Sequence, residues 1–272
     1  MQNFIIKLTA TGIIICSLFT QLASAGAWVP AVGSSYQKFA LNYFEADNFF
    51  GENDEFEEFT SESATYYFEA GIFDNVALFG SLPLQDLRQR TGGNTTQSFG
   101  IGDVELGVRY QWQAEPFVVS TSFTFKAPYF YDENAELPRG NGQEDFEGRL
   151  LIGKSLGRFG YFGLEGGYRL RTDDPSDELR YLVEYGFGVG DNLYFRTKLD
   201  GIQSVNNASE IFDGSGNLSV PAQFDLGKLE LTTGWNFGSG SRWGTEFTYT
   251  RDLFGDNTLQ GNTFQIGLTY VR

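Results

Sequence analysis

The segment from Leu179 to Leu199 constrains the fold most strongly. From Leu179 to Phe187 every second residue is apolar, and polar or small residues lie between them. A period of two is typical of a β-strand with one apolar face and one polar face. After Gly188 to Asn192 the alternation resumes and continues to Leu199. Two such strands joined by Gly, Asp and Asn predict a β-hairpin, whose apolar face meets either a protein core or lipid.

The same alternating unit recurs along the chain, with no convincing helical pattern between the units. About twelve strands are predicted, at 35–46, 60–72, 76–86, 99–113, 117–127, 146–156, 161–171, 179–187, 193–199, 223–236, 242–252 and 262–271. In the tenth of these, Phe224 and Leu226 are out of phase with Leu229. This break predicts a β-bulge or a later start of that strand.

The lengths of the predicted connections alternate. The short ones lie at 73–75, 114–116, 157–160, 188–192 and 237–241, and the long ones at 47–59, 129–145 and 204–221. Short periplasmic turns, longer extracellular loops and an even strand number are typical of a bacterial outer-membrane barrel. A soluble sandwich with Greek-key crossovers is the alternative, but it gives no reason for this alternation. We therefore expect an all-β fold, a transmembrane antiparallel β-barrel of about 12 strands in the bacterial outer membrane.

The first 25 residues differ from the rest of the chain. Lys7 is their only charge, an apolar run spans about Leu8 to Leu22, and Ala23-Ser24-Ala25 follows. This pattern predicts a cleaved secretory signal peptide at 1–25 and a barrel domain at 26–272. A lipoprotein site at Cys16 is the alternative, but Ile15 is bulky for that cleavage position. No later stretch reaches 18 uninterrupted apolar residues, so no transmembrane helix is expected.

Charged residues fall opposite the apolar stripes on most of the predicted strands. On the lipid side, Arg or Lys near the midplane would cost about 2–4 kcal/mol each, so these residues are expected to face the lumen. We predict as pore-lining Asp103, Glu105, Arg109, Glu165, Arg169, Arg171, Arg180, Glu184, Arg196, Lys198, Glu230 and Glu246.

The basic members of this set gather on three consecutive predicted strands, at Arg169, Arg171, Arg180, Arg196 and Lys198. The other strands carry the carboxylates Glu69, Asp103, Glu105, Glu230 and Glu246. A basic wall facing an acidic wall would orient polar solutes. The alternative is a network of salt bridges that fills the lumen. Barrels of about eight strands are filled by side chains and those of about sixteen are open, so twelve strands agree with either arrangement. A turn centred near Gly190 would place Glu184 opposite Arg196.

A family resemblance rests on two motifs. The segment from Gly100 to Trp112 (GIGDVELGVRYQW), with the opening Gly26-Ala27-Trp28, resembles the outer-membrane barrel family associated with the meta-pathway of phenol degradation. The last strand, with Phe264, Ile266, Leu268 and Tyr270, resembles the end of barrels that the assembly machinery recognises, although Val271 and Arg272 follow. The resemblance implies a barrel that transports small molecules, aromatic ones among them. It provides no catalytic residues to assign in this chain.

The chemistry available to the chain is restricted. It contains no His, and its one Cys falls in the predicted signal peptide, so a catalytic base near neutral pH and thiolate metal ligands are both lacking. Asp103 and Glu105 share a face and form the remaining candidate carboxylate pair, but an interior charge ladder explains them as well. The acidic stretches 46–62, 132–136 and 173–178 suit either solvated loops or Ca²⁺ and Mg²⁺. We expect no enzyme activity, no cofactor and no dedicated metal site.

The sequence favours a passive channel or uptake port for small molecules, with aromatic or hydrophobic ones among them. The alternative is a non-conducting structural or surface-interaction barrel, accessory to envelope or exopolysaccharide assembly. The expected partners are outer-membrane lipid, lipopolysaccharide, the barrel-assembly machinery and a small-molecule solute. Nucleic acid is not expected, because the net charge of −16 would repel phosphates.

Overall fold

The computed structural model describes residues 26–51, 53, 56–212, 217–238, 240 and 242–272, so the predicted signal peptide lies outside the described residues. The strands are β1 (Ser35–Phe50), β2 (Phe56–Phe73), β3 (Val76–Thr91), β4 (Asn94–Ile101), β5 (Val104–Gln113), β6 (Val118–Ala127), β7 (Asp145–Ser155), β8 (Tyr161–Arg171), β9 (Glu178–Val189), β10 (Leu193–Ser204), β11 (Asp225–Phe237), β12 (Trp243–Asp256) and β13 (Thr258–Val271).

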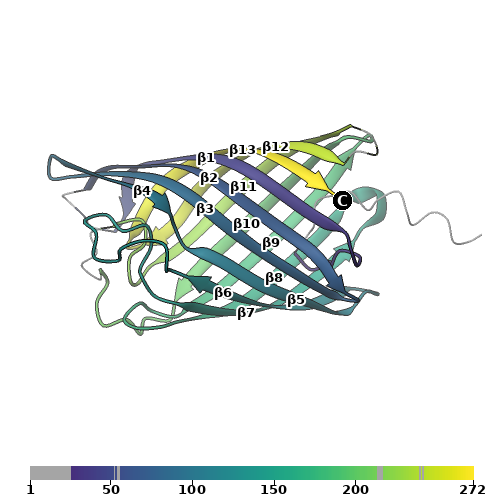
Figure 1. Ribbon diagram of the computed structural model, residues 1–272, viewed down its shortest axis with the longest axis horizontal. Helices are drawn as coiled ribbons and strands as arrows, with labels where there is room; N and C mark the ends of the chain where they lie inside the picture. Colours follow the sequence, from purple (N-terminus) through teal and green to yellow (C-terminus); the bar gives the residue numbers. More distant parts are fainter. Residues whose placement is uncertain (1–25, 52, 54–55, 213–216, 239, 241) are drawn as a thin grey trace, which may run out of the picture.

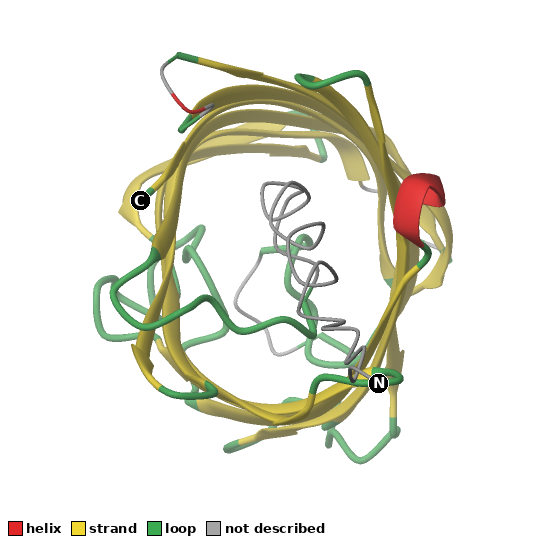
Figure 2. Cartoon of the chain, turned by 90° about the vertical axis from the view of Figure 1, so that its right-hand side faces the viewer, coloured by secondary structure: helices red, strands yellow, loops and turns green. Residues whose placement is uncertain are grey.

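The strands form one closed antiparallel barrel (Figure 2). Apart from β4 and β5, each strand pairs with its neighbour in sequence, and the β1–β13 pairing closes the wall, whereas β4 pairs with β3 alone. The short strands β4 and β5 both pair with β3 along successive parts of its length, so they act as one interrupted strand. The wall therefore has the twelve strands that the alternation predicts, and closure satisfies the backbone groups that lipid could not.

The two ends of the barrel differ (Figure 1). The first described residues and the C-terminus lie at the end with the tight turns, which we call the turn end. The opposite end carries the long connections, and we call it the loop end. Strands β1, β2 and β3 have 16, 18 and 16 residues and extend further toward it than β5 and β6, which have 10 each. One side of the wall therefore stands taller. Barrels of this type place short turns in the periplasm, which makes the loop end extracellular.

The outer surface of the wall is apolar. Large side chains such as Leu41, Leu106 and Ile266 are about half exposed or more in the isolated chain, and each belongs to an alternating apolar stripe. In water such a belt would be strongly unfavourable, but in a bilayer it is the surface that lipid tails solvate. The 3₁₀ turn Gly157–Phe159 lies between β7 and β8, and no helix among the described residues is long and apolar enough to cross a membrane.

Of three predicted details, two change and one is confirmed. The predicted loop at 47–59 is mostly strand, because β1 runs to Phe50 and β2 begins at Phe56. The predicted bulge in the tenth strand is confirmed between Gly227 and Lys228. The predicted hairpin register is wrong by two residues.

The corrected hairpin pairs Lys198 with Glu184, and Arg196 lies opposite Gly186. The reason is the turn, because Val189 pairs with Leu193 and the left-handed Gly190 (φ 63°) starts a three-residue connection centred on Asp191. A shift of two residues keeps every side chain on its predicted face, because the side-chain period of a strand is also two.

Candidate functional site

Ion pairs between strands that are not neighbours identify the inner face. Lys38 on β1 lies 2.6 Å from Glu246 on β12, across β13. Arg169 on β8 lies 3.0 Å from Glu105 on β5, across two intervening strands. Side chains can converge over a skipped strand only on the concave side of a barrel wall, so these charges lie inside the barrel.

Glu246 is the centre of the first group, which we call the Glu246 cluster. Its carboxylate is fully buried, with Lys38 Nζ and the Tyr194 hydroxyl each 2.6 Å away and Arg196 Nη2 at 3.7 Å. Arg196 also reaches Glu230 at 3.6 Å. Three donors around one carboxylate offset the cost of removing it from water, because each supplies a charge-assisted hydrogen bond or an opposite charge.

Glu230 and Glu184 extend this cluster along the β9–β11 wall. Lys198 Nζ lies 3.5 Å from Glu230 Oε1 and 3.6 Å from Glu184 Oε2. Positive and negative charges therefore follow one another from strand to strand.

Asp145 and Glu147 on β7 centre the second group, the Asp145 cluster. Lys126 bridges Asp103 at 3.2 Å and Asp145 at 3.0 Å. Arg169 contacts Asp145 at 3.4 Å and Glu147 at 2.7 Å. The remaining ion pairs of this group are Arg149–Glu147, Arg149–Glu165, Arg171–Asp145, Arg171–Glu178, Arg180–Glu147 and Arg180–Glu178.

Arg109 and Glu69 form a third, separate pair at 2.6 Å, between β5 and β2. Tyr67 donates a further hydrogen bond of 3.0 Å to Glu69, and the Arg109 guanidinium stacks over Phe79 at 5.2 Å. The twelve residues predicted to line a pore thus all carry inner-face ion pairs, distributed over these three groups.

The basic wall is not a separate surface. Asp145, Glu147 and Glu178 lie among its arginines, and Glu184 lies beside Lys198. The sequence reading missed these partners because the sixth predicted strand began at 146 and the eighth at 179, one residue too late for Asp145 and Glu178. Glu147 shares the parity of Arg149, so a strict alternation count would have found it. Alternation also places Lys38 and Tyr194 on the polar face, but only the closed barrel brings them to Glu246.

Part of the inner face keeps contact with open space. The side chains of Glu105, Glu230, Lys198 and Asp103 retain 35%, 25%, 24% and 21% exposure, whereas those of Asp145 and Glu246 retain 2% and 0%. Because the four accessible side chains point into the barrel, the space beside them is interior space wide enough for water. The lumen is therefore not packed solid at their level.

At the turn end, the first described residues cross the inner face of the barrel. We call Gly26–Val32 the strap. Its carbonyl oxygens accept hydrogen bonds from Ser120 Oγ (to Ala27, 2.5 Å) and Arg109 Nη1 (to Trp28, 3.3 Å). Val29 N–H donates to Gln111 Oε1 at 3.0 Å. Ala27 and Trp28 pack on Val118 and Leu151, so the strap is attached to the inner wall by both polar and apolar contacts.

At the loop end, two connections fold together inside the tall part of the wall. We call 128–144 and the described part of 205–224 the plug. Leu137 is buried against Ala46, Phe59, Leu87 and Leu259 on the inner faces of β1, β2, β3 and β13.

Hydrogen bonds join the two plug segments to each other and to the wall. Asn217 Nδ2 donates to the Pro138 carbonyl at 2.6 Å, and Asn141 Nδ2 donates to the Val220 carbonyl. Leu218 N–H donates to Gln89 Oε1 on β3 at 3.0 Å. The plug is thus held in place over the loop end of the lumen.

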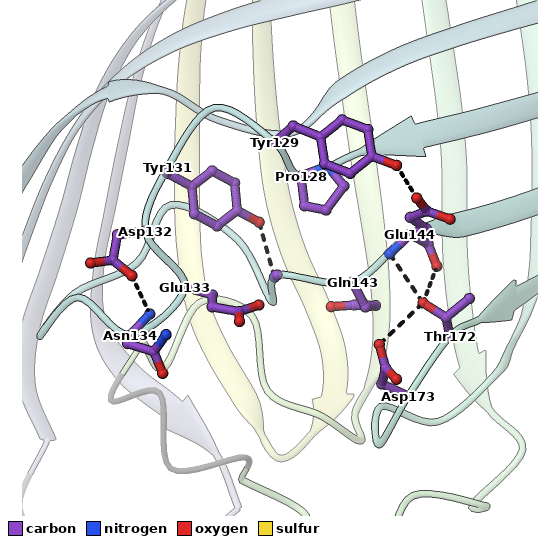
Figure 3. Close-up of a pocket in the computed structure, with 11 residues that line it drawn as sticks. Pro128, Tyr129, Tyr131, Asp132, Glu133, Asn134, Gln143, Glu144, Thr172 and Asp173 are labelled. Carbon is purple, nitrogen blue, oxygen red and sulfur yellow. Dashed lines mark hydrogen bonds between the residues drawn. The ribbon is translucent and has the colours of Figure 1, made fainter.

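A cavity of about 610 Å³ lies between the two ends of the first plug segment and the loop after β8, and is lined by residues 128, 129, 131–134, 142–144, 172 and 173 (Figure 3). No group of three or more His, Cys, Asp or Glu with a geometry for a metal ion occurs in the described part of the chain. The cavity lining includes carboxylate, amide, hydroxyl and tyrosine side chains.

The closed twelve-strand wall, apolar outside and charged inside, defines a bacterial outer-membrane β-barrel. No protein-family model and no curated protein sequence matches the chain. Solved structures do match. The COG4313 outer membrane channel from Pseudomonas putida F1 has a TM-score of 0.71 and 13% identity, over 93% of this chain and 100% of that one.

Two further barrels show how widely the fold is shared. The NanC porin has a TM-score of 0.56 at 10% identity, over 86% of this chain and 98% of the porin. The translocator domain of the autotransporter NalP from Neisseria meningitidis has a TM-score of 0.51 at 11% identity, over 87% of each chain. At these identities the likeness shows a common fold, and the resemblance to the phenol meta-pathway family stays a prediction.

Proposed function

We propose that this protein is a passive outer-membrane channel for small solutes. The observation that carries the proposal is the accessible set of inward charges, Asp103, Glu105, Lys198 and Glu230, at the level of the wall. A charged side chain facing a dry interior would have to be fully paired and buried, as Glu246 is. Partly exposed charges instead indicate water in the lumen, which is what a channel for polar or charged solutes needs.

The strap and the plug restrict the two ends of the proposed channel. The strap narrows the turn end and is held by single hydrogen bonds and a small apolar contact. The plug covers the loop end, where hydrogen bonds and the buried cluster around Leu137 hold it to the wall. Such contacts are individually weak, about 0.5–1.5 kcal/mol for a hydrogen bond. Opening either end therefore requires no rearrangement of the wall.

Fold likeness supports the channel role, since two of the barrels above are a channel and a porin. The family resemblance of Gly100 to Trp112 supports small aromatic or hydrophobic molecules among the solutes. The apolar belt implies contact with outer-membrane lipid and lipopolysaccharide, and the aromatic last strand implies recognition by the barrel-assembly machinery. The proposed role is transport, without catalysis.

A non-conducting barrel is the second candidate, and one observation favours it. The Glu246 and Asp145 clusters tie neighbouring strands together, and the plug is bonded to the wall, so ion pairs and loops occupy much of the interior. A structural or surface-interaction role in the envelope would use such a stiff barrel without flow through it.

Single-channel recording in planar bilayers separates these two functions. We expect reproducible conductance steps from the purified full chain, and a reversal potential in a salt gradient that shifts toward anion permeability in Glu105→Gln. Glu105 suits this test because Arg169, its partner, keeps Asp145 and Glu147. Glu115→Gln, which removes an exposed charge outside the strap and the plug, is the matched control. Persistent silence of a correctly folded barrel would overturn the channel and favour the structural role.

A further inference from the structure

The cavity at the loop end carries four carboxylates and no basic residue. Its lining includes Asp132, Glu133, Glu144 and Asp173, together with two tyrosine rings (Figure 3). None of the four makes an ion pair with any described residue, in contrast to the paired carboxylates of the lumen. Like charges gathered in one cavity repel, so the cavity is electrostatically favourable for a cation.

The basic side chains around the cavity have other partners. Lys126 bridges Asp103 at 3.2 Å and Asp145 at 3.0 Å, below the cavity lining. Arg139 directs its nitrogens to the Ile101 carbonyl (3.0 Å), Ser98 Oγ (2.8 Å) and the Phe130 carbonyl (3.4 Å). Arg171 donates hydrogen bonds to Glu178 Oε1 and Asn141 Oδ1 inside the barrel. The cavity therefore has no internal counter-ion among the described residues.

A second observation, independent of charge, points into the same cavity. Gln143 lines it yet is only 3% exposed, and its Oε1 has no hydrogen-bond partner among the described residues. The orientation of this amide is fixed, because its Nε2 donates to the Asp145 carboxylate at 3.2 Å, and that carboxylate can only accept. The carbonyl oxygen is thus left as an unused acceptor, which a ligand with N–H donors would satisfy.

The framework of the cavity is held in shape without a ligand. Thr172 N–H donates to the Glu144 carbonyl at 3.0 Å, and Glu144 N–H donates to Thr172 Oγ1 at 3.1 Å. Tyr131 donates to Asp103 at 2.6 Å and accepts from Gly142 N–H at 3.0 Å, and burial with the nearby Asp103 charge raises the pKa of its hydroxyl. The Tyr129 ring remains 64% exposed and offers an aromatic face for stacking. A preformed site of this size suits a small organic molecule.

We propose that this cavity is a binding site for a small organic ammonium ion. The ammonium group would donate to Gln143 Oε1 and to the surrounding carboxylates, and its apolar body would lie on the Tyr129 ring through stacking or a cation–π contact. This inference rests on the proposed function in one respect: it takes the cavity at the extracellular end as the place where a solute is first captured. A dedicated divalent-metal site is disfavoured, since no metal-ligand group forms among the described residues.

Titration calorimetry of the full chain in detergent tests binding without any need for conduction. The probe is phenethylammonium, and the matched probes are 2-phenylethanol and 3-phenylpropanoate, which keep the aromatic body but are neutral and anionic. We expect saturable binding of the ammonium alone. Glu133→Gln with Asp173→Asn should weaken it at least roughly tenfold, whereas Asp47→Asn with Glu115→Gln, which removes the same charge elsewhere, should change it less than about twofold.

Gln143→Met provides the second variant, because it keeps the side-chain volume and removes the unused carbonyl. It also removes the Nε2 donor to Asp145, which keeps Lys126 and Arg169 as partners. It should also weaken phenethylammonium binding, with the heat-modifiable migration of the folded barrel unchanged. Equal binding of the neutral probe, no effect of the Glu133 and Asp173 changes, or displacement of the probe by sub-millimolar Mg²⁺ would overturn the proposal. Binding by a barrel that never conducts would refute the channel and leave this site standing, and conduction without binding would do the reverse.

Discussion

Lys198 and Glu184 are direct partners in the β9–β10 ladder, and Lys198 Nζ lies 3.6 Å from Glu184 Oε2 inside the barrel. The same two-residue register difference moves Arg196 away from Glu184 and toward Glu230 and Glu246. Glu184 is almost fully buried and Lys198 keeps 24% side-chain exposure. The pair is thus intermediate between a surface salt bridge and a buried one.

A double-mutant cycle on this pair tests the register. We expect Glu184→Gln to lower the free energy of unfolding by about 1–3 kcal/mol, because Lys198 then keeps only Glu230 as a partner. Urea unfolding in lipid vesicles measures it. Glu184→Gln with Lys198→Gln should show a coupling of about 0.5–1 kcal/mol or more. The control cycle, Glu184→Gln with Arg196→Gln, should couple less, and stronger coupling there would restore the register we reject.

Substitution of Gly153 tests the strap. A Cβ at Gly153 would overlap the Trp28 ring, which packs there and meets Tyr161 edge-to-face at 5.9 Å. Gly153→Leu should therefore displace the strap and increase single-channel conductance. The fluorescence of Trp28 should shift to longer wavelength as its ring becomes wetter.

The matched control is Gly148→Leu on the same strand. Gly148 has open space where its Cβ would lie, so this change should leave both conductance and fluorescence as in the unchanged protein. Equal effects of the two substitutions would indicate a general disturbance of β7 in place of strap release.

Asp177 makes the loop 172–177 sensitive to acid. Partial burial works against its charge, but hydrogen bonds from the Tyr168 hydroxyl (2.7 Å), Arg171 N–H (2.8 Å) and Asn207 Nδ2 (3.2 Å) outweigh this and lower the pKa of the carboxyl. A lowered folded pKa means that the stabilisation is complete above the unfolded value of about 3.9 and is lost as the pH falls below it.

Hydrogen exchange at this loop measures the effect. Protection of Arg171 and Asp177 amides should be constant from about pH 7 to 5 and should fall on the way to pH 3, once corrected for intrinsic exchange rates. Asp177→Asn should show weak protection at every pH. Loss of protection on raising the pH would contradict the assigned sign.

Sidedness follows from the unequal ends of the barrel. An epitope tag inserted after Asn134, an exposed plug residue, should be reached by antibody on intact cells. The same tag at Asp191, in the tight β9–β10 turn, should be reached only after the outer membrane is permeabilised. Reversed accessibility would invert the barrel and place the carboxylate cavity in the periplasm.

The sequence by itself determined the wall. Alternation with period two predicted the strands and the face of each side chain, and those faces survived even where the hairpin register was wrong, because an error of two residues preserves the period. The alternating connection lengths predicted a closed barrel with two unlike ends. These properties are local, so each can be read from a few neighbouring residues.

Only the tertiary structure decided what the interior contains. Glu246 meets Lys38, 208 residues away, because the last strands close on the first. The plug forms because residues near 137 and 218 meet on one wall, and the strap is held by Ser120 and Arg109. The cavity with its unused Gln143 carbonyl depends on the same closure. These contacts join residues far apart in the chain, and strand periodicity carries no information about which distant strands face each other across a lumen.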